Sequence, residues 1–218
     1  MNQEQQLTIS VLMAVFNTPF ELVKRAIDSV LDQHFQNFEL IILDDGSHVS
    51  LGEKILQYSQ THQSKITYIR HKNCGQAQSI NRGVQISRGM YITIIDSDDE
   101  YKPNRLSECL NEMQYADLTS SLTETIVNSA EDYYVPDKND YKKSIHVDDC
   151  ILFATLFGKK EVFRDISFKD MYAADSHFYE QASLQYLVKK VSLRTYIYYR
   201  NTSGSTTATL KKAQLSLS

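Results

Sequence analysis

Four short apolar runs in the first half of the chain have the composition of buried strands. They cover residues 7–16, 39–43, 65–70 and 91–95. The run at 91–95 contains only β-branched or aromatic residues and shows no strict polar alternation. That pattern is typical of a strand covered on both faces, as in a parallel sheet.

Between these runs, apolar positions recur at the spacing of amphipathic helices. The expected helices cover about 19–33, 51–60, 76–88 and 104–115. Thr18, Pro19 and Glu21 predict a capping box at the first helix start, and Gly89 is expected as the C′ glycine that ends the third helix. Four alternations of strand and helix predict a mostly parallel sheet with helices on both faces.

The second half of the chain is less regular. Residues 117–129 contain strand-like pieces, and 131–144 are charged and predict a mobile surface loop, where an enzyme would carry a lid. A helix is expected over 174–189 and a strand over 191–200, followed by a frayed tail at 201–218.

Composition and charge exclude several protein classes. The 218 residues carry a net charge of -4, which argues against a protein held on nucleic acid by a broad basic surface. The three cysteines form no CxxC pair, so neither a zinc knuckle nor a disulfide framework is indicated. The first residues do not resemble a signal peptide, and no apolar run approaches the length of a membrane span. We expect a soluble, cytoplasmic protein, with peripheral docking on the inner face of a membrane left open.

Acidic side chains follow two of the predicted strands. Asp96, Asp98 and Asp99 stand within four residues and repel one another unless a cation lies among them. A metal of the Mg²⁺ or Mn²⁺ type prefers oxygen ligands and often carries phosphates as well. The alternative is that Asp98 and Asp99 only end the strand and cap the next helix.

The second acidic strand end is Asp44–Asp45. In a doubly wound sheet both strand ends can face one crevice, where an Asp away from the metal accepts hydrogen bonds from a base or a ribose. The chain has neither GxxxxGK[ST] nor GxGxxG. Together the two acidic ends indicate a nucleoside-diphosphate site without a P-loop.

Four segments in this order resemble the family 2 glycosyltransferases. They are ISVLMAVFN, AIDSVLDQHFQNFELIILDDGS, NCGQAQSINRGVQISRG and YITIIDSDDEYKPNRL. The resemblance covers residues 7–106 strongly and continues weakly to about 205. It implies an α/β GT-A fold in a single domain, 1–218. Residues 1–106 would bind the nucleotide sugar, 107–205 would form a smaller, irregular acceptor part, and 206–218 would be a tail.

The resemblance also implies roles for individual residues of the donor site. Asp45 would bind the uracil or another base. The other residues assigned to the donor pocket are Ala14, Val15, Phe16, Asn73, Gly75, Asn81 and Ser97. Asp96 and Asp98 would form a DxD pair for Mn²⁺ or Mg²⁺, with Asp98 as the direct ligand and Asp96 on ribose or a metal-bound water.

The resemblance places the general base at Asp175, within the stretch AADSHFY. Ala174 replaces the Glu that usually precedes this residue, and a helix N-cap is the alternative interpretation of Asp175. Two further departures leave the base and sugar preference open. The first strand ends in Ala-Val-Phe-Asn instead of a Pro-x-Tyr-Asn type, and Ile80 stands where Arg is common.

The implied function is metal-dependent, inverting transfer of a sugar, with a UDP-linked donor preferred. The acceptor would be a saccharide or a lipid-linked saccharide of surface-polysaccharide assembly. The main alternative is a relative that binds nucleotide sugar without turnover. A nucleotidyltransferase is disfavoured because residues 17–20 contain no glycine, and a sheet domain with merely solvated acids is disfavoured by the four ordered motifs.

Four weaker candidates stay open at this stage. Arg200 could reach a diphosphate, and the pair Tyr133–Tyr134 could stack on a sugar. His177 fits a surface or partly buried position better than a role in the site. The stretch 146–149 fits acceptor-site or loop structure better than metal binding.

Overall fold

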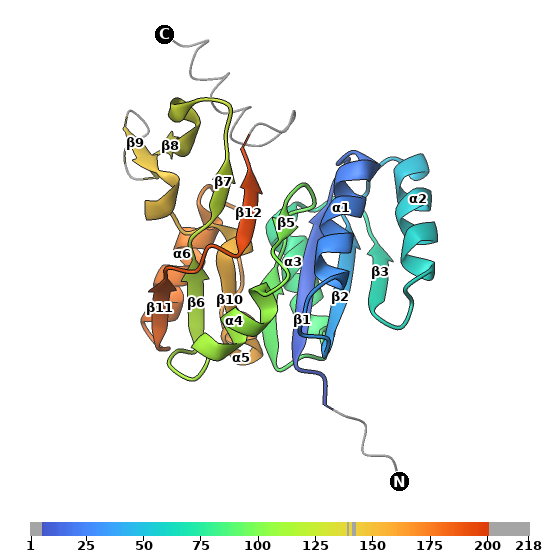
Figure 1. The fold of residues 1–218 in the computed structure, drawn as a ribbon, viewed down its shortest axis with the longest axis horizontal. Helices are drawn as coiled ribbons and strands as arrows, with labels where there is room; N and C mark the ends of the chain where they lie inside the picture. The colour runs from blue at the N-terminus through green and yellow to red at the C-terminus, as the bar shows by residue number, and fades with distance from the viewer. Residues whose placement is uncertain (1–5, 139, 141–142, 201–218) are drawn as a thin grey trace.

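The structure is a computed structural model that describes residues 6–138, 140 and 143–200. Its centre is a seven-stranded sheet with the strand order β11-β6-β10-β4-β1-β2-β3 (Figure 1). The strands of this sheet are β1 (Ile9–Val15), β2 (Phe38–Asp44), β3 (Ile66–Arg70), β4 (Tyr91–Ile94), β6 (Leu118–Ser121), β10 (Leu156–Lys159) and β11 (Val188–Val191).

The two halves of this sheet are paired differently. Strands β4, β1, β2 and β3 are all parallel, as the alternation of strands and helices predicts. Strand β10 runs antiparallel to both β4 and β6, and β11 pairs in parallel with β6 at the edge. The sheet is therefore mostly parallel, and its first half forms a doubly wound unit.

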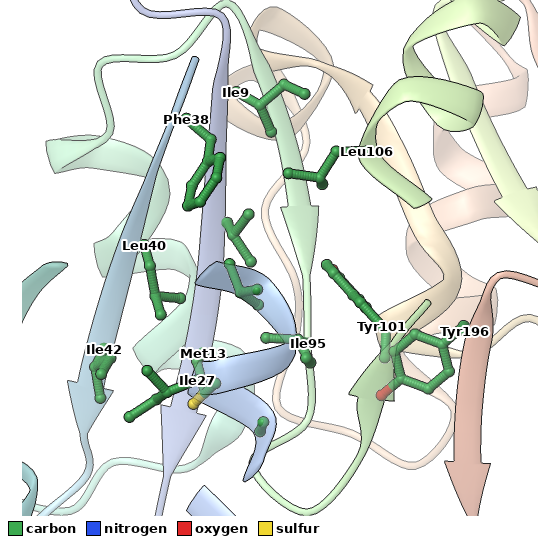
Figure 2. Close-up of a cluster of buried hydrophobic side chains, with 14 of the residues drawn as sticks. Ile9, Met13, Ile27, Phe38, Leu40, Ile42, Ile95, Tyr101, Leu106 and Tyr196 are labelled. Atoms are coloured by element: carbon green, nitrogen blue, oxygen red, sulfur yellow. The ribbon is translucent and has the colours of Figure 1, made fainter. Parts of the chain in front are cut away.

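Helices cover both faces of the sheet, because alternate strand residues point to opposite sides. Val11 and Met13 of β1 pack with α1 (Phe20–Leu31) and α4 (Arg105–Glu112), while Leu12 packs with α3 (Gln76–Ile86). Figure 2 shows part of the first cluster, to which β1, β2 and α1 contribute side chains together with Tyr101 and Tyr196. The remaining helices are α2 (Val49–Gln60), α5 (Lys160–Asp165) and α6 (Ala174–Ser183).

Two smaller sheets complete the second half. One consists of β5 (Glu100–Tyr101), β12 (Tyr196–Tyr199) and β7 (Glu124–Ile126), in the order β5-β12-β7. The other pairs β8 (Tyr134–Pro136) with β9 (Ser144–His146). The segment predicted as a surface loop, 131–144, thus carries a 3-10 turn (Ala130–Tyr133) and one strand of a hairpin. None of the helices among the described residues is long and apolar enough to cross a membrane.

Two local predictions are wrong for identifiable reasons. The hydroxyl of Thr18 lies 2.7 Å from Ser97 Oγ and makes no capping bond to α1, whose N-cap is Pro19. Gly89 is not a left-handed C′ residue. Instead it lies against β1, where a Cβ atom would come within 2.5 Å of the backbone nitrogen of Ser10.

Element boundaries in the second half also differ from prediction. The helix expected over 174–189 ends at Ser183, and its last part becomes β11. The strand expected over 191–200 is confined to Tyr196–Tyr199. The predicted tail at 201–218 lies outside the described residues.

Candidate functional site

The carboxyl ends of β1, β2 and β4 meet at one edge of the sheet. The backbone nitrogen of Asp45 donates to Val15 O at 2.8 Å, and that of Ile95 donates to Leu12 O at 3.0 Å. The bond between Thr18 and Ser97 joins the loops after β1 and β4. The two acidic strand ends therefore lie at the same edge of the sheet, where open α/β sheets bind their ligands.

Asp45 is fixed by the loop that precedes α3. Its carboxylate accepts bonds from Asn73 Nδ2 at 3.0 Å, Cys74 N at 2.7 Å and Gly75 N at 2.9 Å, and the residue is only 3% exposed. Gly75 has a φ of +87°, a conformation that side-chain-bearing residues avoid. The structure thus brings together three of the residues assigned to the donor pocket, Asp45, Asn73 and Gly75.

The three carboxylates after β4 have different surroundings. Asp96 accepts a bond from Gln76 Nε2 at 2.8 Å, and both Asp96 and Asp98 are half-buried. Asp99 is 1% exposed and turns inward, where it accepts from Tyr196 Oη at 2.6 Å and Tyr199 N at 2.8 Å. It caps no helix, since α4 begins only at Arg105.

The acidic loop, Asp96–Asp99, holds three carboxylates close together, and their mutual repulsion disfavours the ionised forms. Burial, together with the neighbouring Asp98 carboxylate, raises the pKa of Asp96 to about 7. Burial and the charges of Asp96 and Asp98 raise the pKa of Asp99 well above its ordinary range. A divalent cation bound by Asp96 and Asp98 would relieve this repulsion, and an all-oxygen donor set fits Mg²⁺ or Mn²⁺.

Asp175 lies in the first turn of α6. Its oxygens accept from Ser176 N at 2.8 Å and Phe153 N at 3.2 Å, and burial raises its pKa to about 6. The N-cap of α6 is Ala173, in a left-handed conformation with φ 54°, so the N-cap interpretation of Asp175 does not hold. A pKa of about 6 suits a general base that works near neutral pH.

A cavity of about 490 Å³ joins the two halves of the chain. Asp96 and Gln76 line it from the first half, and Asp175 lines it from the second. The charge of Asp175 also contributes to the raised pKa of Asp96. Asp45 and Asp98 are not among the residues that line this cavity.

The remaining donor-pocket candidates occupy varied positions. Val15 is fully buried and Ala14 half-buried, whereas Phe16 is 53% exposed at the end of β1. Asn81 stands apart from the others. Its amide donates to Phe168 O at 2.8 Å and accepts from Phe168 N at 2.9 Å, which ties α3 to the segment before α6.

The four weaker candidates differ in their contacts and in whether they line the cavity. Tyr133 and Tyr134 both pack on the ring of His146, at centroid distances of 5.5 and 5.4 Å. Arg200 lines the cavity and donates to the carbonyls of Asp132 and Tyr134. His177 does not line the cavity. These hydrogen bonds link the end of β12 to the segment at 130–134.

The sequence reasoning missed a set of residues that hold the acidic loop. Gln76 and Tyr196 contact it directly, and Arg25 of α1 donates to the backbone oxygen of Asp98 at 2.5 Å. Arg25 also lies over the ring of Tyr199, at 4.0 Å. The only signal in the sequence is the tyrosine-rich stretch at 196–199, which suggests core and edge packing and says nothing of its partners.

The sheet, the acidic loop at its carboxyl edge and the shared cavity define a fold of the GT-A class. Among solved structures, S. aureus TarS in complex with UDP-GlcNAc superposes with a TM-score of 0.72 at 18% identity, over 92% of this chain and 60% of that one. A mannosyltransferase from Pyrobaculum calidifontis, in complex with GDP-Man and Mn²⁺, gives 0.74 at 16% identity, over 97% of this chain and 62% of that one. At such low identity these likenesses show the fold alone.

Residues 10–170 match the family model described as glycosyl transferase family 2, and the chain belongs to this family. The Escherichia coli protein named putative colanic acid biosynthesis glycosyl transferase WcaA is 42% identical over 108 residues, 49% of this chain and 38% of its own length. Glycosyltransferase GlyG of Streptococcus pneumoniae is 31% identical over 144 residues, 66% of this chain and 46% of its own length. The chain thus spans less than half the length of these curated relatives.

Proposed function

We propose that this chain is a metal-dependent, inverting glycosyltransferase that transfers a sugar from a nucleotide sugar to a saccharide or lipid-linked saccharide. The observation that carries the proposal is the shared cavity, into which the first half brings Asp96 and the second half brings Asp175. A donor bound between Asp45 and Asp96 would present its sugar to this cavity. Asp175 would meet the acceptor there.

Names of relatives support the finer parts of the proposal. One solved neighbour holds a UDP-linked sugar and another a GDP-linked sugar with Mn²⁺. One curated relative is named for colanic acid biosynthesis. On this basis we assign a UDP-linked donor, Mn²⁺ or Mg²⁺, and a role in surface-polysaccharide assembly. A lipid-linked acceptor would bring the protein to the cytoplasmic face of a membrane.

The chemistry assigned to the chain's own residues is a single displacement. The carboxylate of Asp175 takes the proton of the acceptor hydroxyl as its oxygen attacks the anomeric carbon. The bond between that carbon and the nucleoside diphosphate breaks in the same step, which inverts the configuration. Asp45 would hold the base, while a cation held by Asp96 and Asp98 would supply positive charge to the departing diphosphate.

The second candidate is a family member that binds nucleotide sugar without turning it over. The observation that favours it is Ala174, in place of the Glu that usually precedes the base. The shared cavity favours the enzyme, because a binding protein has no need to place Asp175 opposite Asp96.

The donor site can be tested without knowledge of the acceptor, by thermal shift. The protein is titrated with UDP, GDP, CDP and dTDP, each with Mn²⁺, Mg²⁺ or a chelator. At a ligand concentration about 100 times the dissociation constant, binding adds about 2.7 kcal/mol, which raises Tm by several degrees. We expect a metal-dependent shift with UDP in wild type and its loss in Asp98→Asn.

Asp165→Asn serves as the matched control, because Asp165 is an exposed acid that pairs with Arg164 on the surface. This variant should keep the full shift. A wild-type protein that responds to no nucleotide would refute the donor site, and a shift unchanged in Asp98→Asn would refute the metal assignment.

A further inference from the structure

Three side chains with different metal-binding groups meet beside the loop that holds Asp45. The carboxylate of Asp45, the imidazole of His71 and the thiol of Cys74 each place one donor atom within 4.8 Å of the others. Asp45 is 3% exposed, the His71 side chain is 10% exposed and Cys74 is a half-buried free thiol. The proposed donor site gives no role to the side chains of His71 and Cys74.

The spacing of these donor atoms matches a tetrahedral zinc site. Zinc binds sulfur at about 2.3 Å and nitrogen or oxygen at about 2.0 to 2.2 Å. A tetrahedron with these bond lengths separates its ligand atoms by about 3.3 to 3.6 Å. The Nδ1 atom of His71 lies 3.4 Å from Asp45 Oδ1 and 3.7 Å from Cys74 Sγ. The same Nδ1 atom also lies 3.0 Å from the backbone oxygen of Lys72, and a bound zinc ion would replace this contact.

The donor types also distinguish this cluster from the acidic loop. Thiolate and imidazole are ligands of zinc and related transition metals, whereas Mg²⁺ and Mn²⁺ favour oxygen. The loop 71–75 already fixes the cluster, because Cys74 N and Gly75 N both donate to the Asp45 carboxylate. Three protein ligands would leave a fourth position open, unlike the closed sets of structural zinc sites.

We propose that Asp45, His71 and Cys74 form a Zn²⁺ site whose occupation blocks nucleotide binding. The first part of this inference stands on the cluster alone. The second part rests on the proposed function, in which Asp45 binds the base. A zinc ion would take up the Asp45 carboxylate oxygen and insert positive charge where the N–H of a base would otherwise donate.

Zinc binding would change the protonation of Cys74 and fix the tautomer of His71. Binding releases the thiol proton of Cys74 to solvent, and the neutral imidazole of His71 must carry its proton on Nε2. That atom is buried and has no hydrogen-bond partner among the described residues. Because ligating histidines normally donate their second N–H to a partner, the missing partner weakens the site. We therefore expect a labile, regulatory ion.

Cobalt(II) provides the direct test, since it replaces zinc in tetrahedral sites and absorbs through thiolate-to-cobalt charge transfer. The full chain is titrated with Co²⁺ and its near-ultraviolet absorption is recorded. We expect a charge-transfer band that saturates at one equivalent and disappears when Zn²⁺ is added. Cys74→Ser should abolish the band, and Cys150→Ser, which removes the other half-buried thiol, should keep it.

The same variants test the regulatory part. In the presence of Mg²⁺, added Zn²⁺ should raise the apparent dissociation constant of UDP at least tenfold in wild type and leave it unchanged in Cys74→Ser. UDP binding by Cys74→Ser without zinc shows that this variant is folded.

Each unfavourable outcome has a separate meaning. The absence of the cobalt band, or its persistence in Cys74→Ser, overturns the metal site. A band without any zinc effect on UDP overturns the regulatory role. If wild type binds no nucleotide at all, the proposed function and the regulatory role fail together, while the cobalt titration still decides the metal site.

Discussion

The two acidic strand ends are supported by parts of the chain at very different sequence distances. The side-chain and backbone donors to Asp45 come from residues 28 to 30 positions away, all in the loop before α3. The acidic loop receives Arg25 from 73 positions back, and Tyr196 and Tyr199 from 97 and 100 positions ahead of Asp99. The contacts of Asp45 thus come from the first half of the chain, whereas the acidic loop also depends on contacts from the second half.

This difference separates the two tasks of the proposed donor site. The side-chain and backbone donors to Asp45 all lie between β3 and α3, so we expect the proposed base contact at Asp45 to form without the second half. The acidic loop takes two hydrogen-bond donors, Tyr196 Oη and Tyr199 N, from β12, which pairs with β5. Changes that remove a β12 contact to the acidic loop should therefore affect metal binding, and changes that remove a side-chain donor to Asp45 should affect affinity for the base.

The largest effect is expected from Asp175→Asn, which tests whether the second half of the chain supplies the catalytic base. Loss of a general base typically lowers the rate by about 10² to 10⁴-fold. UDP affinity should change far less than the rate, because Asp175 lies in the part of the cavity built by the second half and influences Asp96 through its charge. Sugar transfer to an acceptor is measured beside UDP binding. Glu161→Gln is the control, because Glu161 holds the same first-turn position in α5 and does not line the cavity.

The pH dependence of Asp175 sharpens the same test. The base must be ionised, so kcat/KM should fall about tenfold per pH unit below about 6, the pKa of Asp175. Because the folded-state pKa exceeds the ordinary 3.8, the folded state binds this proton more tightly, and stability falls as pH rises from about 4 to about 6. Asp175→Asn should thus add up to about 3 kcal/mol to the unfolding free energy above pH 6. A rate independent of pH from 5 to 7 would exclude Asp175 as the base.

The same contrast explains how much could be predicted from the sequence. The strands and helices of the first half follow from local periodicity. The position of Asp45 and of the loop after β4 at one edge of the sheet follows from the rule for parallel sheets. The expected cap at Thr18 is absent because its hydroxyl bonds to Ser97 instead of to its own helix. The contact of Tyr196 with Asp99 could not be predicted, because a contact across 97 positions leaves no local sequence pattern. Sequence periodicity reports neighbours along the chain, and the acidic loop depends on distant ones.

A smaller effect is expected from Tyr196→Phe, which removes the link between β12 and the acidic loop. The hydroxyl donates to Asp99 at 2.6 Å and accepts from Asp96 N at 3.3 Å, in a fully buried position. Leaving these groups unpaired should lower the unfolding free energy by about 1 to 3 kcal/mol. It should also weaken the metal-dependent part of UDP binding more than the part that remains with chelator.

Chemical denaturation and UDP titrations, with and without Mn²⁺, measure both quantities. Tyr186→Phe is the matched control, since its hydroxyl bonds to Asp165 on the exposed surface. Equal losses with metal and with chelator would show that β12 does not act through the acidic loop.

The smallest effect is expected from Asn73→Ala, which tests the other side of the comparison. Asn73 Nδ2 donates to both the carboxylate and the backbone oxygen of Asp45, each at 3.0 Å, so its loss loosens the proposed base contact. One or two lost hydrogen bonds of about 0.5 to 1.5 kcal/mol each should weaken UDP binding by about three- to tenfold. The loss should be the same with Mn²⁺ and with chelator, in contrast to Tyr196→Phe. Asn37→Ala is the control, because the Nδ2 of Asn37 also donates two bonds, to Gln6 and Thr8, next to the opposite end of β2. A metal-dependent loss in Asn73→Ala would mean that the two strand ends act as one site, and the division drawn between them would be wrong.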